Sequence, residues 1–145
     1  MAVWLLIVLQ FLLGLGAIGG GGVLIAAPDG SIIHMPLSML EYSPFHNFLV
    51  PGIILLTGLG IFPLAIAFSL WQLPAWRWPD FLNPFQRMHW SWAASLAAGV
   101  ITLIWITVEV LILRDIAFLH ILYFAWGCAL ILLTLTESVR KYCTR

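Results

Sequence analysis

The chain has 145 residues, a length that suits one domain. It is 63% hydrophobic and 8% charged, with a mean hydropathy of +1.07, whereas soluble domains carry about 25% charged residues. So few charges cannot cover a water-facing surface, and the six basic and six acidic residues cancel, which leaves no positive field to attract a polyanion. These features exclude a soluble enzyme, a nucleic-acid binder and a disordered tail.

Four stretches of the chain are apolar enough to cross a bilayer, which takes about 20 residues for about 30 Å of hydrocarbon. The first ends at the turn sequence Pro28-Asp29-Gly30-Ser31, and Ser43-Pro44 and Asn83-Pro84 are expected starts of later helices. The predicted fold is all-α, a single integral membrane domain with an up-down four-helix transmembrane bundle. Its spans are expected at about 3–27, 44–71, 85–113 and 116–136, followed by a polar tail at 137–145.

The basic residues predict the orientation of the bundle. Cytoplasmic loops are enriched in Lys and Arg, and five of the six basic residues fall in the linker 72–89 and the tail, whereas Arg114 alone lies on the other side. Both termini are therefore expected in the cytoplasm, and the protein in a bacterial inner membrane as a multi-pass protein. Tryptophans near the cytoplasmic boundary are expected to form an interfacial belt: Trp4, Trp71, Trp76, Trp78, Trp90 and Trp92.

Small residues predict how the helices pack, because membrane helices associate through close backbone approach and hydrogen bonds. The first span contains a G-x-x-x-G pattern at Gly16 and Gly20, and the third offers Ala94 and Ala98. In the second span, Pro51 and Pro63 each remove a backbone hydrogen bond and are expected to bend the helix. The match to G-x-G-x-x-G at 14–19 lies inside a span without a preceding strand, so nucleotide binding is not expected.

Glu109 is the strongest candidate for a functional side chain, because a carboxylate within a span is costly and usually faces the protein interior. It ends a small and polar stripe at helical spacing that includes Ser95, Gly99 and Thr102. A very short turn joins the third and fourth spans, so Glu109 and His120 are expected at one depth of an antiparallel hairpin. Whether they share a face depends on the geometry of the turn.

Further polar residues are expected at the same outer end of the bundle. His34 and Glu41 belong to the first loop and His46 to the start of the second span. Imidazole and carboxylate are ordinary ligands of zinc or iron, but no H-E-x-x-H, E-x-x-H or C-x-x-C spacing is present. A structural hydrogen-bond network, a proton, ion or ligand site and a metal site all remain open, and no cofactor is specified.

Three other polar residues carry simpler interpretations. His89 beside Trp90 is expected to be a polar tip that reaches the interface. Cys128 lies within the fourth span and Cys143 in the tail, about 22 Å apart along a helix, so a disulfide between them is not expected.

The first loop resembles that of a group of small four-span bacterial membrane proteins of uncharacterised function. The resemblance rests on Pro28–Ser31, on Met35-Pro36-Leu37-Ser38-Met39-Leu40-Glu41, on Ser43-Pro44-Phe45 and on Phe48–Gly52, and it extends from the first span to the fourth. It implies the fold and no activity. The Trp- and Pro-rich linker 71–92 departs from this pattern and leaves room for an added interaction surface. Within the loop, Pro36 is expected to start a short helix that caps the outer end of the bundle.

Three function hypotheses follow. The first is a non-enzymatic accessory or oligomer-forming subunit of a larger membrane complex, with the bilayer and other membrane chains or a second copy as partners and no nucleic acid. The second is a small transporter, channel or ligand- or ion-binding protein that uses the polar outer end. The third is a membrane enzyme on a lipid-like substrate with Glu109 and a histidine as acid and base, although no nucleophile with an adjacent base is visible.

Overall fold

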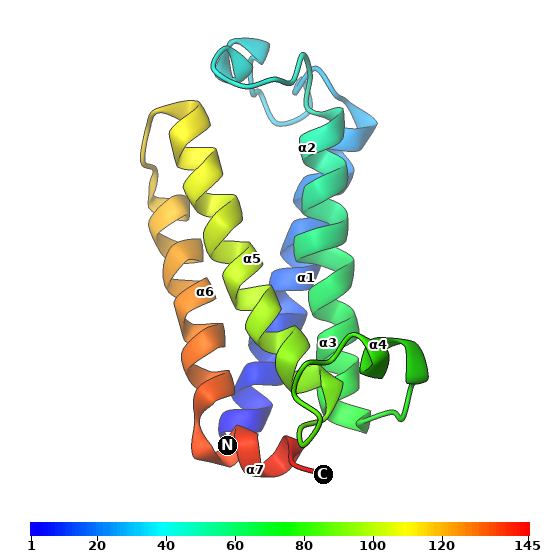
Figure 1. Cartoon of the computed structure of the whole chain (residues 1–145). Coiled ribbons are helices and arrows are strands. Elements are labelled where there is room, and N and C mark those ends of the chain that lie inside the picture. Colours follow the sequence, from blue (N-terminus) through cyan, green and yellow to red (C-terminus); the bar gives the residue numbers. More distant parts are fainter.

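A computed structural model describes all 145 residues as helices joined by turns and short loops (Figure 1). Four helices are long and apolar enough to cross a membrane: α1 (Ala2–Ala26), the composite second span Leu49–Gln72, α5 (Trp90–Leu113) and α6 (Phe118–Leu135). The short elements are the 3₁₀ turn η1 (Leu37–Leu40), α4 (Arg77–Phe81) and α7 (Glu137–Cys143). The predicted all-helical class and the four candidate spans are confirmed.

The long helices pack as two hairpins, one formed by α1 and the second span and the other by α5 and α6. Figure 1 shows both chain termini at one end of the bundle, together with α4 and α7. We call this the tail end. The opposite end, which holds the first loop (27–48) and the turn between α5 and α6, is called the loop end.

Glycines bring the backbones of the first hairpin close together. A methyl group on Gly21 would lie 2.7 Å from the carbonyl oxygen of Gly52, and one on Gly14 would lie 2.8 Å from that of Gly60. Only a residue without Cβ allows these distances. Gly16 and Gly20 of the predicted G-x-x-x-G pattern face another direction and would meet only ordinary side-chain contacts, so the close approach uses different glycines of the same run.

The helices of the second hairpin also approach closely at glycines. Cβ atoms on Gly99 of α5 and Gly127 of α6 would each crowd a side chain and the backbone of the opposite helix. Ala98 is buried beside Gly99, as expected for a packing residue, and Ala94 is half-buried against the core. The predicted stripe is also confirmed, since Ser95 and Thr102 are fully buried.

The second span changes its helical type between its two prolines. It runs as α2 (Leu49–Ile54), the π-helical segment η2 (Leu55–Ile61) and α3 (Phe62–Gln72). Pro63 lacks a backbone N–H and crowds the preceding turn, and a π-helical segment is one way a helix accommodates such a break. The change of helix type therefore lies between Pro51 and Pro63, and the expected bend at each proline stays a prediction.

The second span begins later than the predicted residue 44. Ser43 instead closes a turn, because its hydroxyl donates to the carbonyl of Leu40 and accepts from the N–H of Phe45. The N–H of Phe48 donates to the carbonyl of Pro28 across the loop, and the helix begins at Leu49. The fourth span likewise begins at Phe118, two residues later than the prediction.

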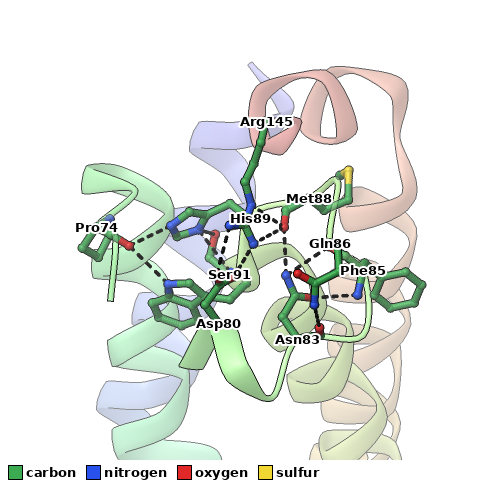
Figure 2. Close-up of polar contacts among 10 residues, drawn as sticks. Pro74, Asp80, Asn83, Phe85, Gln86, Met88, His89, Ser91 and Arg145 are labelled. Atoms are coloured by element: carbon green, nitrogen blue, oxygen red, sulfur yellow. Dashed lines mark hydrogen bonds and ion pairs between the residues drawn. The ribbon is translucent and has the colours of Figure 1, made fainter. Parts of the chain in front are cut away.

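The third span begins at Trp90 instead of residue 85, because the side chain of Asn83 folds residues 83–88 into a loop. Its amide donates to the carbonyls of Phe85 and Met88, and its oxygen accepts from the N–H of Phe85 (Figure 2). Nδ1 of His89 then caps α5 by accepting from the N–H of Ser91, while Nε2 lies 2.8 Å from the carbonyl oxygen of Pro74. His89 is thus a half-buried helix cap with both ring nitrogens bonded to the protein, and its expected place at the interface stays a prediction.

Two of the six predicted belt tryptophans are internal as well. Trp90 and Trp92 are buried, and their indole N–H groups donate to the carbonyls of Pro74 and Thr134. Burial with a satisfied N–H makes an indole a packing residue. The other members of the predicted belt, Trp4, Trp71, Trp76 and Trp78, are exposed.

The predicted polar tail forms a helix that closes the tail end. α7 buries Val139 and Cys143 in the main core, and the carbonyl of Cys143 accepts from the N–H of His89. The guanidinium of Arg145 pairs with Asp80 and donates to the carbonyl of Met88 (Figure 2). The tail is amphipathic rather than only polar, because its apolar residues share one face of a short helix.

A buried polar chain ties the two hairpins together in the tail half. Nε2 of Gln10 in α1 donates to Oγ of Ser95 in α5 at 3.0 Å, and that hydroxyl lies 2.8 Å from Oγ1 of Thr134 in α6. All three side chains are fully buried. The main core, which includes Leu6, Leu13 and Leu130, lies among the same helices.

Candidate functional site

Glu109 and His120 meet at the loop end of the second hairpin. Glu109 lies in the last turns of α5 and His120 in the first turn of α6, and Oε1 of Glu109 is 3.5 Å from Nε2 of His120. His120 is 8% exposed, while the Glu109 side chain retains 34% of its accessible surface. The turn therefore brings the two residues to one face as well as to one depth.

His120 has a second contact that fixes the orientation of its ring. Nδ1 accepts from the backbone N–H of Ala117 at 2.9 Å, which satisfies one of the free donors at the start of α6. In the neutral ring, a nitrogen that accepts a hydrogen bond carries no proton, so the proton lies on Nε2 and faces the carboxylate of Glu109. One imidazole thus caps a helix and orients the carboxylate.

A cavity of about 420 Å³ opens beside this pair. We call it the polar cavity. Its walls come from α1, η2, α5 and α6, and Met35 and Met39 of the first loop lie at its edge. The polar side chains among its lining residues are Glu109, Asp115, His120 and Tyr123.

A second cavity of about 300 Å³ lies between the second span and α5. We call it the apolar cavity, because Glu109 is the one ionisable residue in its lining. The two cavities share the residues at which they adjoin: Met35, Leu59, Trp105, Glu109 and Leu113. Glu109 therefore stands where a polar and an apolar space meet, and volumes of this size accept small ligands.

Acidic residues line the cavities, and no Lys or Arg does. Glu109 and Asp115 line the polar cavity, and neither Lys nor Arg lines either cavity. Arg114, the basic residue of this turn, instead lies over the ring of Tyr42 with Cζ 3.7 Å from the ring centroid. The polar cavity thus presents carboxylates without a nearby guanidinium or ammonium in its wall.

The other candidate residues do not join this site. His34, Glu41 and His46 are exposed and line neither cavity. No three His, Cys, Asp or Glu side chains come together in an arrangement that could hold a metal ion. Five residues of the first loop do line the cavities: Met35, Met39, Leu40, Phe45 and Phe48. Met39 and Leu40 belong to the expected short helix η1, and Leu40 is buried.

Sequence reasoning did not single out Met35 or Asp115, which line the polar cavity. Trp105 and the buried Ile106 are neighbours in α5, and both line the cavity. In the sequence, Asp115 indicates only the short turn between the third and fourth spans. Its carboxylate accepts from the N–H of Ile116, and its place in the cavity wall depends on the left-handed backbone of Arg114 (φ 53°) before it.

Comparisons of this chain with models of protein families, with curated proteins and with solved structures found no match. The resemblance of the first loop to small four-span bacterial membrane proteins stays a prediction. The site is therefore interpreted from its own residues.

Proposed function

We propose that this protein binds an amphiphilic molecule from the bilayer between its two helical hairpins. The observation that carries the proposal is the position of Glu109, which lines both the polar and the apolar cavity. A polar group and a hydrocarbon chain on one ligand would find complementary surroundings on the two sides of this residue. This is the ligand-binding form of the second function hypothesis.

The packing of the hairpins supports this proposal. Gln10, Ser95 and Thr134 join the hairpins in the tail half, and the main core lies there. Toward the loop end the hairpins are separated by the two cavities. Because the hairpins are joined in the tail half and separated by cavities toward the loop end, a ligand can enter without disturbing the core.

The chemistry of the lining favours binding over covalent catalysis. Neither cavity is lined by Ser, Thr or Cys, the usual nucleophiles of acyl transfer. The Glu109–His120 pair can exchange a proton but has no nucleophile beside it. A membrane enzyme is accordingly the last of the three hypotheses.

The proposed orientation places the tail end in the cytoplasm. Arg77, Arg87, Arg140, Lys141 and Arg145 belong to segments at this end, as the positive-inside rule requires. The cavities then open in the outer leaflet of a bacterial inner membrane, and the chain crosses it up and down with both termini inside. Added cysteines at Ser31 and Ser138, probed with a membrane-impermeant maleimide, test this topology.

Saturable labelling in lipid nanodiscs tests binding. A long-chain alcohol that carries a diazirine is expected to crosslink to residues 35–39 and 105–113, and an excess of the same alcohol without diazirine should compete. Met35→Trp fills space shared by both cavities and should reduce the competed labelling. Leu37→Trp is the matched control, because Leu37 is exposed in the same loop and lines neither cavity. Labelling that spreads over all lipid-facing helices and ignores Met35→Trp would refute the proposal.

A second candidate is the accessory or oligomer-forming subunit. It is favoured by glycines of α1 that make no close contact within the bundle. Methyl groups on Gly19 and Gly22 would meet nothing within 4 Å, and Gly16 is exposed nearby on α1. Small residues on a lipid-facing surface are typical of helix–helix contacts with another chain. Gly19→Leu should then abolish association in mild detergent while the monomer stays folded, and a strictly monomeric wild type would exclude this candidate.

A further inference from the structure

Resting on the proposed binding function, we propose that the ligand is a long-chain amine: its ammonium group pairs with Glu109 in a cavity wall that also carries Asp115, and its hydrocarbon chain lies in the apolar cavity. A cationic head group fits the charges of the lining and the contacts that these charged groups already make.

The lining offers acceptors and negative charge to a ligand. Glu109 and Asp115 are the carboxylates of the polar cavity, and no Lys or Arg lines it. A carboxylate or phosphate head group would meet like charges there, which disfavours binding. An ammonium group has three donors and no acceptor, so it matches a wall that presents carboxylate oxygens.

The existing contacts leave acceptor capacity on both carboxylates. Glu109 faces Nε2 of His120 through Oε1, and Asp115 accepts from the N–H of Ile116 through Oδ1. An ionised carboxylate has about four acceptor positions. Its second oxygen therefore remains for a ligand in each case.

The guanidinium of Arg114, the basic residue of this turn, does not line the polar cavity. Arg114 directly precedes Asp115, but its guanidinium lies over the ring of Tyr42 in the first loop. This arrangement keeps the positive charge out of the cavity wall. A ligand ammonium would supply the countercharge that a carboxylate in a membrane span requires.

The adjoining apolar cavity accounts for the long chain. It lies between the second span and α5, and apart from Glu109 its lining residues carry no ionisable group. Because Glu109 lines both spaces, one molecule can place its head beside the carboxylates and its chain among Leu59, Ile101 and Ile104. A short amine lacks this second set of contacts.

Three photoreactive probes with one chain length test the inference: a long-chain amine, the corresponding alcohol and the corresponding carboxylic acid, each with a diazirine at the same carbon. In nanodiscs of neutral lipid, the amine is expected to reach half-saturation at a concentration about tenfold lower than the alcohol, as charge-assisted hydrogen bonds imply. The acid should bind more weakly than the alcohol. Butylamine at the concentration of the long-chain amine should not compete.

Glu109→Gln is expected to remove the advantage of the amine over the alcohol, and Asp115→Asn to reduce it. Asp115 is exposed, so its variant supplies the decisive comparison if Glu109→Gln does not fold. Glu137→Gln is the matched control, since Glu137 is an exposed carboxylate of the tail end paired with Lys141. It should leave the ratio of amine to alcohol unchanged.

The outcomes separate the two proposals. Equal half-saturation of the three probes, preference for the acid, or full retention of the amine preference in both variants overturns the head-group assignment and leaves cavity binding intact. Absence of saturable labelling at the cavity with every probe overturns the proposed function itself.

Discussion

The imidazole of His120 joins the start of α6 to the carboxylate of Glu109: Nδ1 accepts from the N–H of Ala117 at 2.9 Å, and Nε2 lies 3.5 Å from Oε1 of Glu109. The ring therefore has one structural contact and one contact with the site. These two roles can be separated by substitution.

His120→Ala is expected to destabilise the protein by about 1 kcal/mol or more, because the first turn of α6 loses its cap. Glu109→Gln should cost less, since it retains the shape of the side chain and leaves the cap intact. Unfolding in mixed micelles, followed by circular dichroism, measures both values. Equal effects of the two substitutions would contradict the capping role of Nδ1.

The glycines of α1 divide into two classes that Ala substitution should distinguish. Gly21→Ala would bring a methyl group within 2.7 Å of the carbonyl oxygen of Gly52, and the helices must separate to relieve it. We expect a loss of about 1–3 kcal/mol in the free energy of unfolding. Gly22→Ala is the control in the next position, where nothing lies within 4 Å, and it should be neutral or stabilising by up to about 1 kcal/mol. A similar loss in both variants would contradict the observed packing.

Ser95→Ala tests the buried polar chain between the hairpins. It leaves Nε2 of Gln10 and Oγ1 of Thr134 without their common partner, and Oε1 of Gln10 has no partner already. Hydrogen bonds between membrane helices contribute about 0.6 kcal/mol on average and up to about 1.7, so a loss in this range is expected for each bond. Thr107→Val is the control, because the exposed Thr107 hydroxyl bonds only its own helix. Equal stability of the two variants would contradict a role of Ser95 in joining the hairpins.

The ion pair between Asp80 and Arg145 should hold α7 against the linker at neutral pH. The hydrogen bond from Arg145 lowers the pKa of Asp80 below its ordinary value of 3.8. A carboxyl whose pKa is depressed on folding contributes stability above its unfolded pKa and loses it as the pH falls through the folded value. The contact should therefore persist from neutral pH to about pH 4 and weaken below it. Asp80→Asn should increase hydrogen exchange at the amides of His89 and Arg145. Exchange that is unchanged by this substitution at pH 7 would contradict the role of the ion pair in holding α7 against the linker.

Cys143 should report the docking of α7. Its side chain is 1% exposed, and burial raises the pKa of its thiol to about 11. Because the thiolate is the reactive form, a maleimide should modify Cys143 slowly at pH 8 in the folded protein and rapidly after unfolding. The raised pKa also stabilises the fold fully below pH 9, the ordinary value, and this contribution is lost as the pH rises through about 11. A Cys128→Ser background isolates the signal, and rapid labelling of the folded protein would show that α7 is not docked.

The sequence determined the features that depend on local composition. The number of spans follows from apolar length, the stripe of Ser95, Gly99 and Thr102 from helical spacing, and the common depth of Glu109 and His120 from the short turn. The starts of the second and third spans were misplaced, because the Ser-Pro and Asn-Pro signals also occur in turns. At both sites the side chain of the polar residue closes a loop instead of capping a helix.

Only the tertiary structure decided which of these residues meet. Pairing of Gly21 with Gly52 depends on the rotation of two helices that are separated by a long loop, and composition does not encode that rotation. Likewise, the direction of the turn at Arg114 sends its guanidinium to Tyr42 and leaves Asp115 in the cavity wall. A shift of one residue along a helix rotates the position that contacts a neighbour by about 100°. Which face of a helix is buried is therefore specified by packing between distant segments, whereas the number of spans follows from local composition.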